Sequence, residues 1–319
     1  MRAALYTLLI FSHCAGATEF VPFATGNRSP IALVYGLPPP RATADASYLE
    51  FEQELANVYT AANTAREAIE LDGEIYFTRL HGGWRRSDWR YDASVPFISH
   101  GGGFLDHAVD EWHSTFGFDS GGREGAPRDR LRYVYVRDGR VVFERRTQVA
   151  GVGDMQLGLA HRLLPGWRAG LKLPTGDTWL GSGAFDASVE HYAARAFLDA
   201  RLHGWYRAGG LWLGRGDLWP EAQRRTVAFA DAALSYPVTA STRVQAQLGG
   251  HTPFYRDSAL PQFGASAQLG LGVALRAADG WLVQFGFTED VRVGTAADIG
   301  FFLRVSTDRE RAQRADAPQ

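Results

Sequence analysis

Acidic residues recur at every second position in two stretches of the N-terminal third of the chain. These residues are Glu50, Glu52, Glu54, Glu70, Asp72 and Glu74. Side chains two residues apart point to the same side of a β-strand, so each stretch would present a row of carboxylates on one face. Carboxylates this close repel one another unless basic groups or cations compensate them. The pattern predicts either packed ion pairs or a surface that selects charged solutes.

Residues 99–114 hold side chains that could act in catalysis or bind a metal. Two adjacent serine–histidine pairs are present, Ser99-His100 and His113-Ser114, and four possible metal ligands are His107, Asp110, Glu111 and His113. Adjacency does not give the geometry of a nucleophile and its base, and no third group is evident to orient them. On a helix His107 and His113 would be about 600° apart, unlike the i, i+4 pair of a helical zinc site. We therefore expect no enzymatic activity, no metal site and no cofactor.

The elements that position these residues are predicted by alternation. From residue 263 to 275 every odd position is apolar, while the even positions carry glycine, serine, glutamine or alanine. The same alternation recurs at 154–159, 167–173, 243–248 and 281–288. This alternation is typical of β-strands with one apolar face. After the N-terminal apolar run at 3–11, no apolar run reaches the ~20 residues that a membrane helix needs. Long strands in segment after segment, with aromatic residues near the ends of the apolar band, favour a transmembrane β-barrel over a soluble sandwich.

About twelve antiparallel strands are expected in this all-β fold. They lie near 47–60, 66–83, 87–98, 149–163, 167–175, 187–198, 202–213, 225–236, 242–251, 262–276, 280–290 and 297–306. Short links such as 85–86 alternate with longer ones such as 99–148, although the link at 61–65 is shorter than this rule expects. Outer-membrane barrels have short periplasmic turns and long extracellular loops, so the even strand number predicts that both termini are periplasmic.

The N-terminus predicts export. Arg2 precedes an apolar run at 3–11 and the small residues Ala15-Gly16-Ala17, which together resemble a secretory signal peptide of residues 1–17. Its removal would take away Cys14, the only cysteine, which suits an oxidising compartment. The 33 basic residues would fall to 32 against 35 acidic ones, a net charge of −3. This charge does not favour a nucleic-acid partner.

Three segments are expected to differ from the strands of the barrel, which spans residues 47–306. Residues 18–46 are rich in proline and would form a periplasmic arm or a segment in the lumen. The long extracellular loop 99–148 would contain a hairpin around Asp138-Gly139 and a short helix. The helix would carry Phe104, Ala108, Trp112 and Phe116 at a spacing of four. The loop would cap or plug the barrel, and residues 307–319 would form a polar tail.

Several motifs resemble those of one outer-membrane family. They are Asn27-Arg28-Ser29-Pro30, Gly36-Leu37-Pro38, residues 99–106, Trp112-His113 and Pro127-Arg128-Asp129-Arg130. With them, nearly the whole mature chain resembles the family of unknown function called DUF3187. Residues 151–157 and 171–177 are similar to a broader group of outer-membrane transporters, which includes members of the phenol-degradation (MetA-pathway) type. The resemblance implies an integral barrel in the bacterial outer membrane, and it brings no catalytic residues.

If the apolar faces of the strands meet lipid, the alternate polar positions face the lumen. We expect the two carboxylate rows and Asp92 to form an acidic wall. The basic residues expected in the lumen are Arg90, Arg162, Arg168, Lys172, Arg207, Arg243, Arg276 and Arg304. Such an interior could be packed with mutually satisfied ion pairs, which is the more favoured reading in a small barrel. It could instead form a narrow pore with a transverse field.

Two functions remain open at this stage. The first is a narrow channel or transporter for a small solute, gated by loop 99–148. The second is a non-conducting structural or surface-binding barrel, and an outer-membrane lipid hydrolase is a less favoured third. The expected partners are outer-membrane lipid and lipopolysaccharide, the barrel-assembly machinery and a small solute.

Overall fold

The computed structural model describes residues 20–40, 47–107, 111, 115, 127–198, 201–277 and 280–308. The predicted signal peptide and most of the predicted tail lie outside these residues. The strands are β1 (Tyr48–Asn63), β2 (Glu67–Arg86), β3 (Trp89–Gly101), β4 (Arg132–Arg137), β5 (Arg140–Arg145), β6 (Val149–Val152), β7 (Gln156–His161), β8 (Trp167–Lys172), β9 (Asp186–Phe197), β10 (Leu202–Leu213), β11 (Thr226–Pro237), β12 (Thr242–His251), β13 (Ser266–Arg276), β14 (Trp281–Asp290) and β15 (Ile299–Asp308). Two helical turns, α1 (Pro30–Leu33) and η1 (Pro261–Phe263), complete the described elements. No helix in this part of the chain is long and apolar enough to cross a membrane.

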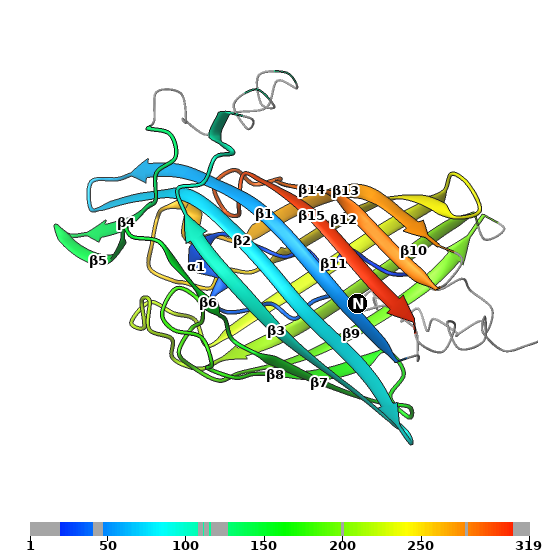
Figure 1. Cartoon of the computed structure of the whole chain (residues 1–319). Helices are drawn as coiled ribbons and strands as arrows, with labels where there is room; N and C mark the ends of the chain where they lie inside the picture. Colours follow the sequence, from blue (N-terminus) through cyan, green and yellow to red (C-terminus); the bar gives the residue numbers. More distant parts are fainter. Residues whose placement is uncertain are drawn as a thin grey trace, which may run out of the picture.

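The strands close into an antiparallel barrel. β1 pairs with β2 on one side and with β15 on the other, so the first and last strands of the chain complete the ring (Figure 1). β3 continues the ring through β6 and β7, which together take the place of one predicted strand, 149–163. The ring thus has twelve strands, which confirms the all-β barrel predicted from alternation.

The two ends of the barrel differ in their connections. Short turns at 87–88, 162–166, 198–201, 238–241 and 277–280 join strands at one end, here named the turn end. Longer links at 173–185, 214–225 and 252–265 lie at the other, here named the loop end. Because antiparallel strands run up and down the wall, successive links lie at opposite ends of the barrel. Short links at one end and long links at the other therefore alternate along the chain.

A hairpin extends the wall at the loop end. β4 and β5 flank Asp138-Gly139, as the turn signal predicts, and β4 pairs with the part of β2 that runs beyond the ring. The guanidinium of Arg66, in the β1–β2 turn, donates bonds of 2.7 and 2.8 Å to the carboxylate of Asp138. This bidentate bond holds the pKa of Asp138 below its usual value. Of the predicted loop helix, Phe104 is exposed, while Ala108, Trp112 and Phe116 lie outside the residues whose side chains are described.

The outer wall is apolar. Leu80, Phe97 and Leu234 are 52%, 50% and 52% exposed, respectively. Large aromatic side chains such as Trp167 and Trp281 stand near strand ends at the turn end. Exposed apolar side chains over most of a barrel wall, with aromatic residues at its rim, fit a hydrocarbon environment and not water.

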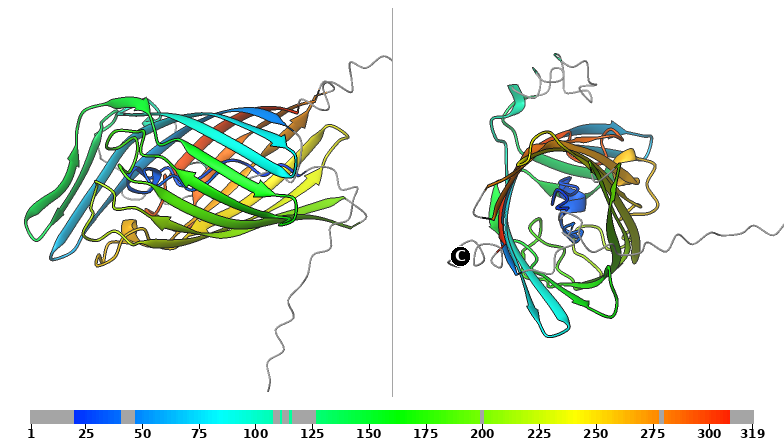
Figure 2. Two further views of the ribbon diagram at one scale, coloured as in Figure 1. Left: turned by 90° about the horizontal axis from the view of Figure 1, so that it is seen from below. Right: turned by 90° about the vertical axis from the view of Figure 1, so that its right-hand side faces the viewer.

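Residues 20–40 lie inside the barrel. Figure 2 shows this segment running through the ring, with α1 on its axis. Phe20 stacks on Trp205 near the turn end, while Tyr35 stacks on Phe254 in the long link 252–265 at the loop end. The segment therefore reaches along much of the lumen. Of the two positions expected for residues 18–46, the described part occupies the lumen.

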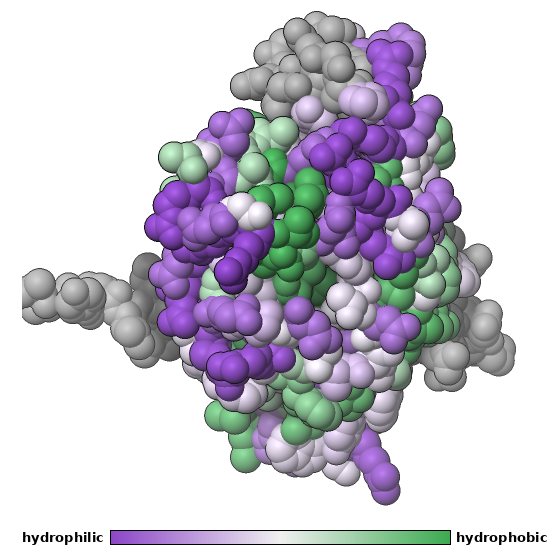
Figure 3. Space-filling model, turned by 90° about the vertical axis from the view of Figure 1, so that its left-hand side faces the viewer, coloured by the Kyte–Doolittle hydropathy of each residue, from purple (hydrophilic) through white to green (hydrophobic). Residues whose placement is uncertain are grey.

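Aromatic residues pack together above the segment at the loop end. The ring of Tyr135 on β4 lies 5.0 Å from that of Trp219 and 4.7 Å from that of Phe263. Tyr255 joins the same group and donates a hydrogen bond to the Ile31 carbonyl of α1. Seen from this end, an apolar hollow is surrounded by hydrophilic surface (Figure 3).

Candidate functional site: the charged lumen

A first group of ion pairs lines the lumen on β15, β1 and β2. The register places Glu52 between Arg304 on β15 and Arg79 on β2, and places Glu50 beside His81. Arg304 pairs with Glu50, and Arg79 pairs with Glu52. His81 Nδ1 lies 3.0 Å from the Glu50 carboxylate. All these side chains are buried, so alternation along three neighbouring strands creates one interior charged cluster.

A second group continues on β3 and β8 to β11. Arg168 donates bonds of 2.7 and 2.9 Å to Asp92 and one of 3.1 Å to Glu190. Arg207 lies 3.2 Å from Glu190 and 2.6 Å from Asp231. His81 Nε2 is 3.7 Å from Asp92 and joins the two groups. The result is a continuous chain of acidic and basic side chains around much of the lumen, with His81 as its link.

A third group lies toward the loop end. Lys172 on β8 contacts Asp154 at 2.5 Å and Asp186 at 3.1 Å, and it also bonds to the Ser182 hydroxyl. These partners replace the hydration that the buried ammonium loses. Desolvation of ions costs several kcal/mol each, so these pairs add little net stability. Removing one member would nonetheless leave an uncompensated buried charge.

The segment of residues 20–40 is bonded to the charged wall. The main-chain carbonyls of Pro22, Ala24 and Pro38 accept hydrogen bonds from Arg304, Arg79 and Arg207, respectively. Each of these arginines also holds a carboxylate, so the wall arginines serve both the ion pairs and the segment.

Arg28 is the segment's own charged contact. Its guanidinium lies 2.7 Å from the carboxylate of Glu54 and 3.6 Å from that of Glu52, and it stands 3.7 Å from the centre of the Phe77 ring. Asn27 Nδ2 lies 2.9 Å from His251 Nε2 on β12. Polar contacts thus anchor the segment to both β1 and β12.

The first acidic row lies in the lumen and the second does not. On β2, Arg79 and His81 face the interior, whereas Glu70, Asp72 and Glu74 share the parity of exposed Leu80. The second row faces outward beyond the ring and is covered by residues 102–107 and 127–132. There Arg130 pairs with Glu70 and Asp72, and Glu74 accepts a bond from the Leu105 amide. The expected acidic wall of seven carboxylates is corrected: the row on β1 and Asp92 lie in the lumen, whereas Glu70, Asp72 and Glu74 form a separate outer cluster.

The predicted basic residues also divide. Arg168, Lys172, Arg207 and Arg304 lie in the ion-pair groups, and Arg90 is buried on the face that carries Asp92. Arg243 bonds to Ser235 near the turn end, and Arg276 is half-buried at the last residue of β13. Arg162 is a correction: it lies in a turn past the end of β7, with its side chain 64% exposed and paired with Asp88. The strand predicted to reach residue 163 ends at His161, so alternation does not apply to it.

The serine–histidine pair that the structure describes, Ser99-His100, does not form a catalytic arrangement. Ser99 and His100 are neighbours on β3 and point to opposite faces. The His100 ring is buried between the Tyr133 hydroxyl at 3.2 Å and the Trp179 carbonyl at 2.9 Å. His113 and Ser114 lie outside the described residues, as does Asp110 of the possible metal cluster. Within the described part of the chain, no group of three or more potential ligands could hold a metal ion.

Several interior residues were not predicted. Arg28, Arg79, His81, Asp154, Asp186, Glu190 and Asp231 all belong to the ion-pair groups. Glu190 and Asp231 fall on the polar face of predicted strands, so alternation alone could have found them. Arg28 could not have been found in this way, because it lies in a segment without strand periodicity.

Comparisons with known proteins bear on this barrel. The family model for proteins of unknown function, DUF3187, matches residues 3–307. The chain belongs to this family. That confirms the resemblance predicted from the motifs at 27–38 and 99–130. A search of curated protein sequences finds no significant match.

Among solved structures, similar ones are outer-membrane proteins. The COG4313 outer-membrane channel from Pseudomonas putida F1 is similar with a TM-score of 0.52 and 13% identity, covering 86% of this chain and 97% of that one. The toluene transporter TodX of Pseudomonas putida matches with a TM-score of 0.42 and 11% identity over 83% and 90% of the two chains. A Pseudomonas aeruginosa FadL homologue gives 0.38 and 11% over 83% and 90%. The first of these likenesses shows the outer-membrane barrel fold of the DUF3187 chain.

Proposed function

We propose that this DUF3187 chain is an integral outer-membrane channel for a small solute, closed by residues 20–40. The proposal rests on the contacts that hold residues 20–40 against the barrel wall. It fills the lumen through hydrogen bonds from wall arginines to its main-chain carbonyls and through one arginine of its own. Water can replace such bonds when the segment moves, and the wall arginines would keep their carboxylate partners. The segment also makes apolar contacts, because Phe20 stacks on Trp205 and residues 31–35 belong to the hydrophobic cluster at the loop end, so opening would also expose these side chains.

The apolar outer wall supports the outer-membrane location, and the alternation of turns and loops supports an orientation. We propose that the turn end and both termini are periplasmic. The loop end, with its apolar hollow, would then receive solute from outside the cell. Loop 99–148 contributes β4 and β5 to the rim of this hollow, so the gate is assigned to residues 20–40 and not to the loop.

Tethering the segment tests the gate. The mature chain would have no cysteine of its own, so the double variant Asn27→Cys with His251→Cys would place two thiols at facing positions, where Asn27 Nδ2 now lies 2.9 Å from His251 Nε2. In planar bilayers the purified full chain should show discrete openings. A short, reducible bifunctional thiol reagent should abolish them in the double variant, and a reductant should restore them. Each single-cysteine variant, treated with the same reagent, should continue to open.

Two results would overturn this proposal. The absence of openings in the untreated chain would favour the non-conducting barrel. Openings that persist after verified cross-linking would show that residues 20–40 do not close the path.

Surface labelling tests the orientation. An epitope inserted between Asp138 and Gly139, in the exposed β4–β5 turn, should bind antibody on intact cells. The same epitope inserted between Pro165 and Gly166, in the β7–β8 turn, should bind only after the outer membrane is permeabilised. The opposite pattern would show that the turn end faces outward, and soluble full-length protein in the periplasm would contradict the location itself.

A further inference from the structure

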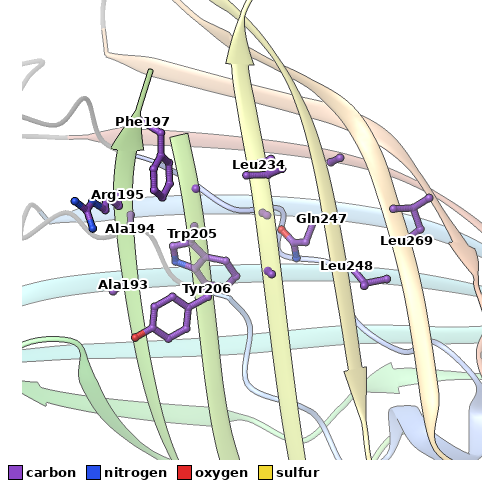
Figure 4. Close-up of a pocket in the computed structure, with 14 residues that line it drawn as sticks. Ala193, Ala194, Arg195, Phe197, Trp205, Tyr206, Leu234, Gln247, Leu248 and Leu269 are labelled. Carbon is purple, nitrogen blue, oxygen red and sulfur yellow. The ribbon is translucent and has the colours of Figure 1, made fainter. Parts of the chain in front are cut away.

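The outer wall carries an apolar groove on β9 to β13. Its volume is about 480 Å³, within the range of roughly 300–1,000 Å³ of small-molecule sites. Small side chains on outward-facing positions form its floor, namely Ala193, Gly204, Ala232 and Ala246. Phe197 and Leu248 stand among its walls (Figure 4). The groove forms where small outward-facing residues on four neighbouring strands lie beside larger ones such as Phe197, Leu234 and Leu248.

The ring of Phe197 lies against the main chain of Gly204. A Cβ added at Gly204 would meet that ring at 2.8 Å. The glycine therefore lets the aromatic ring pack flat at the end of the groove nearest the turn at 198–201. This end would lie at the periplasmic level of the membrane in the proposed orientation.

A single cation stands beside the groove. Arg195 lines it and is exposed, and its guanidinium lies 5.7 Å from the centre of the Phe197 ring. On the strands β8 to β13, all of whose residues are described, Arg195 is the one charged side chain on an outward-facing position. The ion pairs of the described residues do not include it. A guanidinium on a lipid-facing wall is costly unless it reaches the interface and meets an anion.

We propose that the groove binds an acyl chain of an anionic phospholipid whose phosphate is bound by Arg195. The charge identifies the occupant: a guanidinium matches the geometry of phosphate, and the groove beside it offers almost no polar surface. The position two residues before the end of β9 places the guanidinium close to headgroup level. A second copy of the chain would present the same cation to this surface and would not neutralise it. The inference rests on the proposed membrane location but not on channel activity.

Photolabelling with two matched probes tests this site. The full mature chain would be reconstituted in phosphatidylethanolamine vesicles containing a trace of phosphatidylglycerol with a diazirine near the end of one acyl chain. The second probe is diacylglycerol with the same diazirine chain and no phosphate. Peptides from β9 to β11 should be labelled about tenfold more by the phospholipid, as expected for one charge-assisted hydrogen bond.

Variants separate the two parts of the site. Arg195→Gln should remove the preference for phospholipid, whereas Arg201→Gln in the adjacent turn should not. Ala232→Trp should fill the groove and suppress labelling there by both probes. Ala228→Trp, on the outward face of the same strand but away from the groove, should leave labelling unchanged.

Each other outcome contradicts the inference. Equal labelling by the two probes, or labelling unaffected by Arg195→Gln and Ala232→Trp, would show ordinary boundary lipid. Cross-links between copies through β9 to β11 would show a protein interface instead. Failure of the chain to insert in vesicles would contradict the proposed location, whereas insertion without selective labelling would overturn this inference alone.

Discussion

Replacing Arg168 by methionine is expected to lower the free energy of unfolding by about 3–5 kcal/mol. The Arg168 guanidinium is buried and joins Asp92 to Glu190. Methionine has a long side chain that can occupy much of the space, so the main loss is charge compensation and not volume. Asp92 would lose both hydrogen bonds from Arg168 while His81 stays 3.7 Å away, and Glu190 would keep Arg207. Urea unfolding of the barrel, reconstituted in lipid vesicles, measures the change.

Arg162→Met is the matched control. Arg162 also pairs with an aspartate, Asp88, at 2.9 Å, but both side chains are more than half exposed. Exposed pairs of this kind contribute about 0–1 kcal/mol. Equal and small losses in the two variants would show that water fills the lumen around Arg168, which is the pore reading of the charged interior. A large loss at Arg168 alone would show that the closed lumen is packed.

The strands were predictable because they obey one rule along nearly their whole length. A strand buried on one face against lipid must alternate, and β13 does so at every outward-facing position, whereas β14 does so up to Phe287 and then places Glu289 on that face. The predicted strand ends also lie close to the observed ones, because turn residues such as Pro165-Gly166 interrupt the alternation. The split of the predicted strand 149–163 was missed because one strand was assumed to keep one outward face. The register against β3 shifts by one residue between β6 and β7, so the exposed face changes from that of Val152 to that of Leu157.

The side of the sheet that faces lipid was less predictable. On β2, Ile69 and Leu71 are apolar and suggest an outward face, yet both are buried among the aromatic residues at the loop end. The lipid-facing side of the same strand is marked by Leu80 and Trp84 instead. Alternation cannot distinguish an apolar face that meets lipid from one that meets a protein core. For this reason Glu70, Asp72 and Glu74 were wrongly predicted to face the lumen.

The segment of residues 20–40 was the part of the site least open to prediction. Its position depends on contacts with residues more than 200 positions away, such as Asn27 with His251 and Phe23 with Gln247. No local periodicity records these contacts. Its proline content is equally compatible with an extended arm in water, so only the assembled lumen distinguishes the two.

Arg28→Met is expected to open the channel. The residue provides the segment's charged contact with the wall, and its loss would leave Glu54 facing an apolar side chain while Glu52 keeps Arg79. An uncompensated buried carboxylate destabilises the closed state by up to about 3–5 kcal/mol, or a factor of roughly 10²–10⁴ in the ratio of closed to open channels. Once the segment leaves, Glu54 would be hydrated at the wall and would favour cations. Single-channel recordings should therefore show a higher open probability and a higher permeability ratio of potassium to chloride.

The double variant Arg28→Met with Glu54→Gln separates the two effects. Glutamine removes the uncompensated charge at nearly the same volume, so the open probability should fall to a value between those of Arg28→Met and the unchanged chain. The gain in cation selectivity should disappear with the carboxylate. Heat-modifiable migration in detergent gels should be the same for all three proteins, because the ion pairs between wall strands do not include Arg28. If Arg28→Met opens no more often than the unchanged chain while the barrel remains folded, the segment is not held by this charge. If the double variant keeps the cation selectivity, Glu54 does not line the open path.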